Sequence, residues 1–456
     1  MQDMIDIGTV EEMLARQEKT ALREILVRLE GADIAELLSE AEKDALVLLY
    51  RMLPKELAAE AFAEMDADMQ EHLIASFTDS ELQYVLSELY LDDTVDMIEE
   101  MPAGVVKRIL KNSTSDNRRM INELLRYDPD SAGGLMTTEY MVLKAEMTVE
   151  QSFAVIRKNA YDKESVYTCY VTDASRHLIG VVDVKTLLLS SYETKIADCM
   201  NPDVIFVSTD AASEEVARQF EKYNFIAIPV VDREQRLVGI ITFDDAMDVI
   251  VEEAEEDFAK MAAVTPSDLP YLRTPAVKLW QNRFPWLLLM MLTSTFTGMI
   301  ISSFETALAA SVALTAFIPM LMGTGGNSGA QSSVTVIRGL SLGELYPKDI
   351  LRILLKELMV SLLCGITLAA ATFGKMMTLD RWIMGADVIG ISVALTVSLA
   401  LLATVICAKL IGAVLPVLAV KCKLDPAVMA SPFITTVVDA ISLLLYFFIA
   451  KSVLHI

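Results

Sequence analysis

The sequence predicts a multidomain protein in which a soluble, strongly acidic half precedes a membrane half of five helices. The first observation is the charge distribution. The chain has 456 residues and a formal net charge of −25, but residues 271–456 carry thirteen basic and eight acidic residues. The first 270 residues therefore hold a net charge of −30. The second observation is that long apolar stretches occur only in the C-terminal part.

Composition excludes several classes of protein. An acidic surface argues against nucleic-acid binding, which needs a basic footprint. The five cysteines show no paired spacing, so we expect a reducing compartment, no disulfide framework and no zinc site. The three histidines are scattered, so no His-based catalytic motif can be assembled and we expect no enzyme. The polar start, residues 1–12, lacks the basic and apolar regions of a signal peptide.

Residues 1–130 are predicted to form an all-α superhelix built from short helix hairpins. Thr78-Asp-Ser-Glu81 is a capping box, and apolar residues follow it at helical spacing. Asp92 and Asp96 fall four residues apart on one helical face, where like charges repel each other unless a cation bridges them. Acids near a helix N-terminus are also favoured by the helix dipole, so both interpretations stay open.

Residues 131–250 contain an internal repeat, in which Leu178-Ile-Gly-Val-Val-Asp183 recurs as Leu237-Val-Gly-Ile-Ile-Thr242. The repeat resembles a tandem pair of CBS modules, an α/β unit that commonly binds adenine nucleotides. The second copy keeps the usual nucleotide motif through Thr242 and Asp245, which makes these two residues the candidate ATP contacts. The first copy has Asp183 and Thr186 at the matching places.

Residues 251–275 are predicted to form a helix that links the CBS pair to the membrane half. Five acids lie within six residues at its start, so an isolated helix would be weakened by self-repulsion. Bound divalent cations would relieve this repulsion. The alternative is an ordinary solvated polar face.

Residues 276–456 contain five stretches long enough to cross a bilayer. They are 284–304, 311–337, 351–377, 384–416 and 432–454. Basic residues are more frequent on one side of these spans, which places the acidic half in the cytosol. The second stretch contains Gly323-Thr-Gly-Gly-Asn-Ser-Gly-Ala-Gln331, which predicts irregular backbone along a water-filled path or tight packing of small residues.

Asp439 is a single carboxylate in the middle of the last apolar stretch. An Asp at the bilayer centre costs about 2.5–3.5 kcal/mol, so we expect it to face an ion path, with a cation as its partner. The alternative is a hydrogen bond to Ser or Thr of a neighbouring helix. Asp425 is a second candidate ligand, or simply an acid at a helix N-terminus before Pro426.

Taken in order, these features resemble the MgtE family of magnesium channels over essentially the whole chain. The resemblance rests on Gly133-Gly-Leu-Met-Thr137, the CBS pair, the acidic helix, the glycine-rich span and Asp439. It implies a homodimer in the bilayer of the bacterial inner membrane, with a cytoplasmic N-terminal half. Asp439 of both subunits would hold a largely hydrated Mg²⁺.

The resemblance also implies regulatory Mg²⁺ sites between the N domain, the CBS pair and the linking helix, which becomes the family's plug helix. Matching motifs assign the ligands as Glu60, Asp92, Asp96, Glu214, Asp245, Asp248, Glu253, Glu256 and Asp257. Asn224 departs from the pattern, because an acid is frequent there, and Ser431 stands where Asn often precedes proline.

Two other functions are compatible with this organisation. One is a CBS-regulated anion channel, which is disfavoured by an intramembrane acid and by the expectation that the spans hold no base. The other is a non-conducting membrane sensor, in which the glycine-rich span and Asp439 would serve packing alone. The sequence therefore predicts a channel for divalent cations that is closed by cytosolic Mg²⁺.

Overall fold

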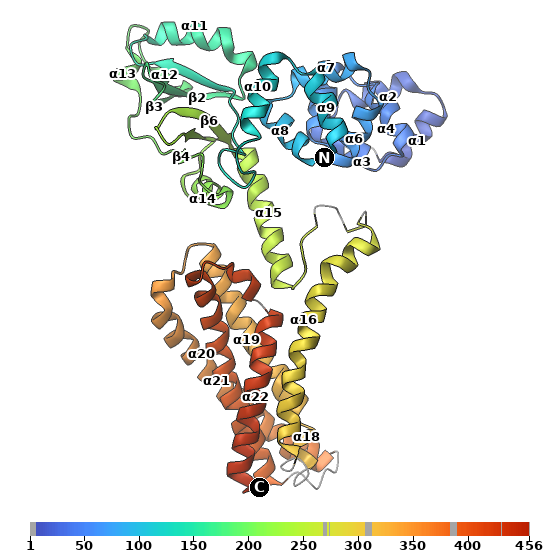
Figure 1. Cartoon of the computed structure of the whole chain (residues 1–456), viewed down its shortest axis with the longest axis vertical. Coiled ribbons are helices and arrows are strands. Elements are labelled where there is room, and N and C mark those ends of the chain that lie inside the picture. The colour runs from blue at the N-terminus through green and yellow to red at the C-terminus, as the bar shows by residue number, and fades with distance from the viewer. Residues whose placement is uncertain are drawn as a thin grey trace. The chain divides into compact units, whose positions relative to one another are not determined.

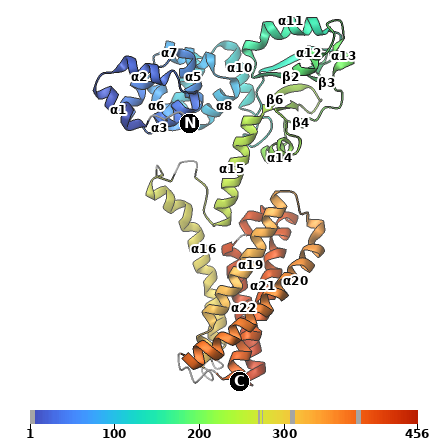
Figure 2. The ribbon, with the colours of Figure 1, turned by 180° about the vertical axis from the view of Figure 1, so that it is seen from behind.

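The computed structural model describes residues 6–267, 271–272, 274–305, 312–383, 390–429 and 431–455. The chain divides into two compact units, one up to Ile250 and one from Val251 onward. Figures 1 and 2 show the two units from opposite sides.

The first unit begins with a series of short helices that form the N domain, as the sequence predicts, and that run from right to left in Figure 1. Thr78 and Glu81 form the expected capping box at the start of α7. The helices share an apolar core that includes Leu22, Phe62 and Leu73. Their bounds are α1 (Ile7–Ala15), α2 (Lys19–Leu26), α3 (Gly31–Ser39), α4 (Lys43–Tyr50), α5 (Lys55–Ala63), α6 (Ala67–Ser76), α7 (Asp79–Glu88), α8 (Leu91–Glu100), α9 (Ala103–Asn112) and α10 (Ser115–Leu124).

The CBS pair follows, and its two copies have the same sheet topology, which confirms the internal repeat. In each copy the first strand runs parallel to the second, and the second runs antiparallel to the third. The strands are β1 (Tyr140–Lys144), β2 (Ser165–Thr172), β3 (Leu178–Asp183), β4 (Val207–Ser208), β5 (Ala227–Val231) and β6 (Leu237–Thr242). The helices are α11 (Val149–Asn159), η1 (Ala160–Asp162), α12 (Val184–Leu189), α13 (Ile196–Cys199) and α14 (Ser213–Tyr223).

The two CBS copies are interwoven through the segments that precede them. Thr137 pairs with Ile240 of β6, and Asn201 pairs with Val181 of β3. The repeated glycine makes this possible, because a Cβ on Gly239 would lie 2.6 Å from the sulfur of Met136. Each copy is therefore completed by the segment that precedes the first strand of the other copy.

Helix α15 (Phe243–Met261) is the linking helix, but its bounds differ from the prediction. It begins inside the second CBS copy, at the end of β6, and ends at Met261 rather than near residue 275. The part up to Ile250 belongs to the first unit and the rest to the second. One helix therefore carries acids of both units.

The second unit is helical, and among the described residues four helices are long and apolar enough to cross a membrane. These are α16 (Ala276–Ser303), α20 (Ile350–Lys375), α21 (Ile391–Lys421) and α22 (Ser431–Leu454). Figures 1 and 2 show α19 (Ile318–Ser341) running beside α21 and α22. Shorter elements are α18 (Val312–Thr315), η2 (Pro347–Asp349), the π-helical η3 (Met376–Ile383) and η4 (Pro426–Met429).

The predicted second span corresponds to α19, which is 24 residues long. It is less apolar than the other four because glycine and serine occupy much of it. Its glycine-rich segment is continuous helix, so the irregular backbone that we considered is not observed there. The first residues of the predicted fourth span, 384–389, lie outside the described residues, and α21 begins at Ile391.

Candidate cation sites

The first candidate site is a group of carboxylates where α8 of the N domain meets the CBS pair. Asp92 lies in the first turn of α8, while Glu139 precedes β1 and Glu164 precedes β2. One carboxylate oxygen from each of these three residues lies within 4.8 Å of the others. The backbone N–H of Leu91 also donates to Oε2 of Glu139 at 3.2 Å. This group, together with Asp93 and Asp96 of the same helix, is called the α8 junction below.

Burial makes the α8 junction costly in the absence of a cation. Asp92 is only 7% exposed, and its Oδ1 has no hydrogen-bond partner. Oε2 of Glu164 is likewise buried without a partner. Within the described part of the chain, no lysine or arginine forms an ion pair with Asp92, Asp96 or Asp245. A buried carboxylate needs a proton or a cation, because leaving it charged and alone is strongly unfavourable.

The pKa values of the junction carboxyls are raised, which reflects the same cost of leaving these groups charged. Burial is the largest cause in each case, even though Asp96 is more exposed to solvent than the other three, and neighbouring carboxylates, Asp245 among them, add to it. The pKa of Asp93 rises to about 6, that of Asp96 to about 7 and that of Glu164 to about 8. The pKa of Asp92 is also raised well above its usual range. The carboxyls of the junction therefore hold protons more tightly than ordinary exposed carboxyls do.

Asp245 reaches this region from the start of α15. Its Oδ2 accepts a 2.5 Å hydrogen bond from the hydroxyl of Thr242, and burial raises its pKa despite that bond. Asp248, one turn further along, is exposed. The part of its carboxyl that is buried raises its pKa first, and the nearby charge of Asp244 raises it further. The predicted ligands Asp92, Asp96 and Asp245 are thus brought into one electrostatic cluster.

Sequence reasoning missed three members of this cluster, Asp93, Glu139 and Glu164. Glu139 and Glu164 lie in connections before two neighbouring strands, and only the fold brings these connections to α8. No local signal in the sequence marks these two residues, because it is the parallel pairing of β1 with β2 that places the residues before the two strands at one edge of the sheet.

The structure does not bring two other predicted ligands to this cluster. Glu214 is exposed and forms an ion pair with Arg218 one turn further along α14. Glu60 is exposed on α5, where its Cβ would lie 2.9 Å from a Cβ built on Gly31. The assignment of Glu60 and Glu214 as ligands stays a prediction from the resemblance.

The second candidate site is Asp439, which lies in the middle of α22. Its Oδ1 is buried and has no hydrogen-bond partner among the described residues, so the expected alternative of a Ser or Thr donor is not observed for this oxygen. Val438 and Ser442 beside it pack against α19, where a Cβ on Gly325 would lie 2.8 Å from the Ser442 hydroxyl. Asp439 therefore lies next to the contact between α22 and the glycine-rich helix.

The glycines of α19 permit this contact. A Cβ on Gly326 would lie 2.8 Å from the methyl group of Thr435, and a Cβ on Gly412 of α21 would lie 2.2 Å from the carbonyl oxygen of Gly329. Any larger residue would push these helices apart. The tight-packing interpretation of the glycine-rich segment is the one that the structure supports.

The expectation that the spans hold no base is wrong. Lys409 lies within α21 and is 5% exposed. Its Nζ is 3.4 Å from the hydroxyl of Ser332, which donates a 2.6 Å hydrogen bond to Glu357 of α20. A lysine inside a helical bundle is tolerated when an acid shares its hydrogen-bond network, as Glu357 does here.

The third candidate site lies at the end of α15 and at η4. Oδ1 of Asp425 accepts a 2.8 Å hydrogen bond from the N–H of Ala427, as expected for an acid before Pro426. Its Oδ2 is 2.6 Å from Nζ of Lys260, which also contacts Glu256. Asp257 accepts a 3.3 Å hydrogen bond from Ser341, and Glu253 lies one turn earlier on α15.

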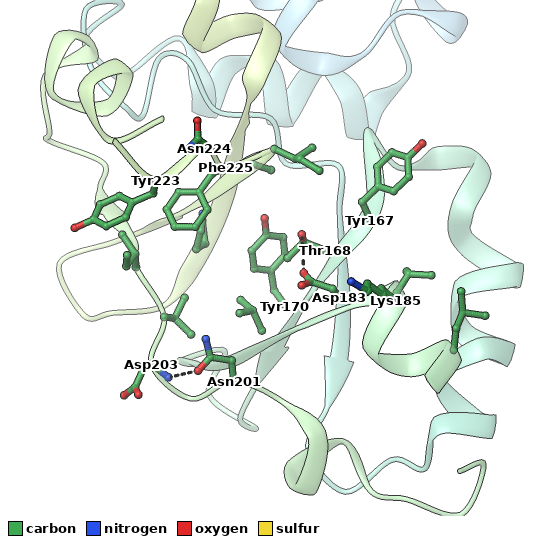
Figure 3. A pocket seen from close by; sticks show the side chains of 18 of the residues that line it. Tyr167, Thr168, Tyr170, Asp183, Lys185, Asn201, Asp203, Tyr223, Asn224 and Phe225 are labelled. Carbon is green, nitrogen blue, oxygen red and sulfur yellow. Dashed lines mark hydrogen bonds between the residues drawn. The ribbon is translucent and has the colours of Figure 1, made fainter. Parts of the chain in front are cut away.

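A large cavity of about 950 Å³ lies in the CBS pair and is shown in Figure 3. The first copy contributes Tyr170, Asp183 and Lys185, and the second contributes Tyr223 and Phe225. Asp183 accepts a hydrogen bond from Thr168 at 3.3 Å (Figure 3).

Thr242 and Asp245, the predicted nucleotide contacts, do not line this cavity. They bond to each other, and Asp245 acts on the α8 carboxyls. Of the two copies of the motif, the first one faces the cavity.

Comparison with known proteins agrees with this organisation. Family models match residues 318–449 as a divalent cation transporter, 29–130 as the MgtE intracellular N domain and 196–252 as a CBS domain. The chain is 37% identical to the magnesium transporter MgtE of Thermus thermophilus over 451 residues, covering 98% of both chains. It is 32% identical to that of Bacillus subtilis over 437 residues, covering 95% of this chain and 94% of the relative.

Solved structures resemble the first unit. The cytosolic domain of the Mg²⁺ channel MgtE in complex with ATP is 36% identical, with a TM-score of 0.51, and the match covers 53% of this chain and 99% of that one. The soluble part of a magnesium transporter is 30% identical, with a TM-score of 0.50, over 54% and 98% of the two chains. The predicted fold class and family are thus confirmed, and the chain belongs to the MgtE family of divalent-cation transporters.

Proposed function

We propose that this protein is a Mg²⁺ channel of the bacterial inner membrane that works as a homodimer and admits Mg²⁺ to the cytosol. Its relatives are named magnesium transporters and span the same length. The observation that carries the proposal in this chain is Asp439, whose buried Oδ1 has no partner in a helix packed against a glycine-rich neighbour. Two such carboxylates would hold a Mg²⁺ that keeps most of its water, because Mg²⁺ dehydrates reluctantly.

The acidic half, which we place in the cytoplasm, acts as the sensor. One carboxylate oxygen each of Asp92, Glu139 and Glu164 lies within 4.8 Å of the others, and two charges at that distance repel by roughly 3 kcal/mol at an effective dielectric constant of 20. Cytosolic Mg²⁺ cancels this repulsion and favours the compact state. When Mg²⁺ falls, the repulsion favours separation of the N domain from the CBS pair, and α15 transmits the change to the membrane domain.

The cavity of the CBS pair is the proposed place for ATP. A related cytosolic domain has been solved with ATP, and the cavity offers stacked aromatic rings of Tyr223 and Phe225 together with Asp183 and Lys185. The anion channel gains no support from Lys409, because that lysine is buried in a network with Ser332 and Glu357.

Flux into proteoliposomes that contain a Mg²⁺-sensitive dye tests the proposal. The wild type should conduct at low cytosolic Mg²⁺, and Asp439→Asn should lower the flux by at least about tenfold because the transported ion loses its carboxylate. Asp349→Asn is the matched control, since Asp349 lies in the short η2 element and pairs with Arg352. Equal flux through wild type and Asp439→Asn would refute a path along Asp439, and a reversal potential set by Cl⁻ would favour the anion channel.

A further inference from the structure

The end of α15 contains a positive charge held between two carboxylates. Nζ of Lys260 is 2.7 Å from Oε1 of Glu256, on the same helix, and 2.6 Å from Oδ2 of Asp425, which precedes η4. The Lys260 side chain is 24% exposed.

This ion pair lies at the centre of a docked segment. Met261 packs against Ile337 of α19 and Ala427 of η4. Further along, the N–H of Thr265 donates to the carbonyl of Asn282 at 3.0 Å, and Asn282 returns a bond to the carbonyl of Pro266. Asn282 itself is 7% exposed in α16. The last turn of α15 and the segment that follows it are therefore anchored to α19, η4 and α16 of the second unit.

Glu256 and Asp425 are both residues that the sequence assigns to divalent cations. Two carboxylate oxygens that converge on one point are also what a divalent cation requires. In this chain that point is filled by Nζ of Lys260, which supplies the positive charge from within the protein. The site thus differs from the α8 junction, where no described lysine or arginine pairs with Asp92.

We propose that Lys260 is a tethered cation that occupies the two-carboxylate site of Glu256 and Asp425 and keeps the end of α15 docked on the membrane domain without a divalent cation. The inference rests on the proposed function for its consequence, which concerns gating. The contact between the end of α15 and η4 is then held by the chain's own positive charge, whereas the α8 junction responds to Mg²⁺. Removal of the ammonium opens the site to Mg²⁺ itself.

Hydrogen exchange of the purified full-length protein tests the docking without reference to transport. We compare backbone amides of residues 257–264 in EDTA and in millimolar Mg²⁺. Wild type and the charge-preserving Lys260→Arg should be equally protected in both. Lys260→Met, which keeps the length but not the charge, should exchange at least about tenfold faster in EDTA and regain protection in Mg²⁺. Asp425→Asn should exchange faster in both, because it removes the shared ligand.

Two results would overturn the inference. One is wild-type protein that loses protection in EDTA as fully as Lys260→Met, and the other is Lys260→Met that stays protected there. Unchanged exchange in α21 serves as the check that the variants are folded. In the flux assay, Lys260→Met should need several-fold more cytosolic Mg²⁺ for half-closure. A wild type that does not conduct Mg²⁺ would refute the proposed function, and the exchange result would stand independently of it.

Discussion

The α8 junction and the end of α15 are built from the same residue types but satisfy their charges differently. At the junction, Asp92 and Glu164 have buried oxygens without partners. At the end of α15, Asp425 has a backbone N–H on one oxygen and Lys260 on the other. We propose that the junction depends on ions from solution, whereas at the end of α15 both oxygens of Asp425 have partners within the chain.

The membrane domain repeats this contrast. Glu357 of α20 accepts a hydrogen bond from Ser332, which also contacts Lys409, so one acid is balanced inside the bundle. Asp439 of α22 is not balanced, because its buried Oδ1 has no partner among the described residues. Of the two acids, we therefore propose Asp439 as the ligand of a passing cation.

A basic side chain introduced into the α8 junction tests whether the lack of one is what distinguishes the junction from the end of α15. Glu164→Lys should place an ammonium beside Asp92 and Asp93, which would replace the bound cation. We expect the Mg²⁺ concentration that half-protects the α8 amides from hydrogen exchange to fall about tenfold or more. Glu164→Gln is the control, since it removes one charge without supplying a cation and should not reproduce that fall. A junction that still requires the wild-type Mg²⁺ concentration would contradict the electrostatic account.

Protons should also replace Mg²⁺ at the junction, though less completely. The compact junction has raised carboxyl pKa values of about 6 for Asp93, 7 for Asp96 and 8 for Glu164, so it binds more protons than the open one. Its stability is thus fully present below the ordinary carboxyl pKa and is lost as pH rises through about 6 to 8. In EDTA, protease cleavage between the N domain and the CBS pair should be several-fold slower at pH 6 than at pH 8. Faster cleavage at pH 6 would show that the sign is wrong.

The smallest effect is expected at Glu214. This residue was matched to a family ligand, but it is exposed and already paired with Arg218 on its own helix. An exposed pair of this kind contributes about 0.3–0.5 kcal/mol. Glu214→Gln should therefore change the half-closing Mg²⁺ concentration by less than about twofold in the flux assay. A tenfold shift in that concentration would mean that Glu214 leaves Arg218 to bind a cation and that a third regulatory cation site exists.

Much of the fold could be predicted because its signals are local. The capping box at Thr78 marks α7, and the repeat that ends at Asp183 and Thr242 gives two sheets of one topology. The carboxylate of Asp439 is conspicuous because its surroundings are apolar. Asp92 and Asp96 could be singled out because helical spacing alone puts them on one face.

The rest depends on contacts that the sequence does not encode locally. Glu139 and Glu164 join Asp92 only after β1 and β2 pair. Lys260 is one more charge in an acidic helix until η4 brings Asp425 against it. The sequence of the nucleotide motif at Thr242 does not reveal whether the motif lines a cavity. In the structure Thr242 instead bonds to Asp245 at the start of α15, outside the cavity.

The most direct test of the account is a patch recording of Asp92→Ala combined with Asp96→Ala at high cytosolic Mg²⁺. The variant lacks two bridging carboxylates, while Asp93, Glu164 and Asp245 still repel one another. The account predicts that the variant keeps conducting at Mg²⁺ concentrations that close the wild type. Closure of the variant at the wild-type concentration would contradict it and would place the Mg²⁺ sensor outside the α8 junction.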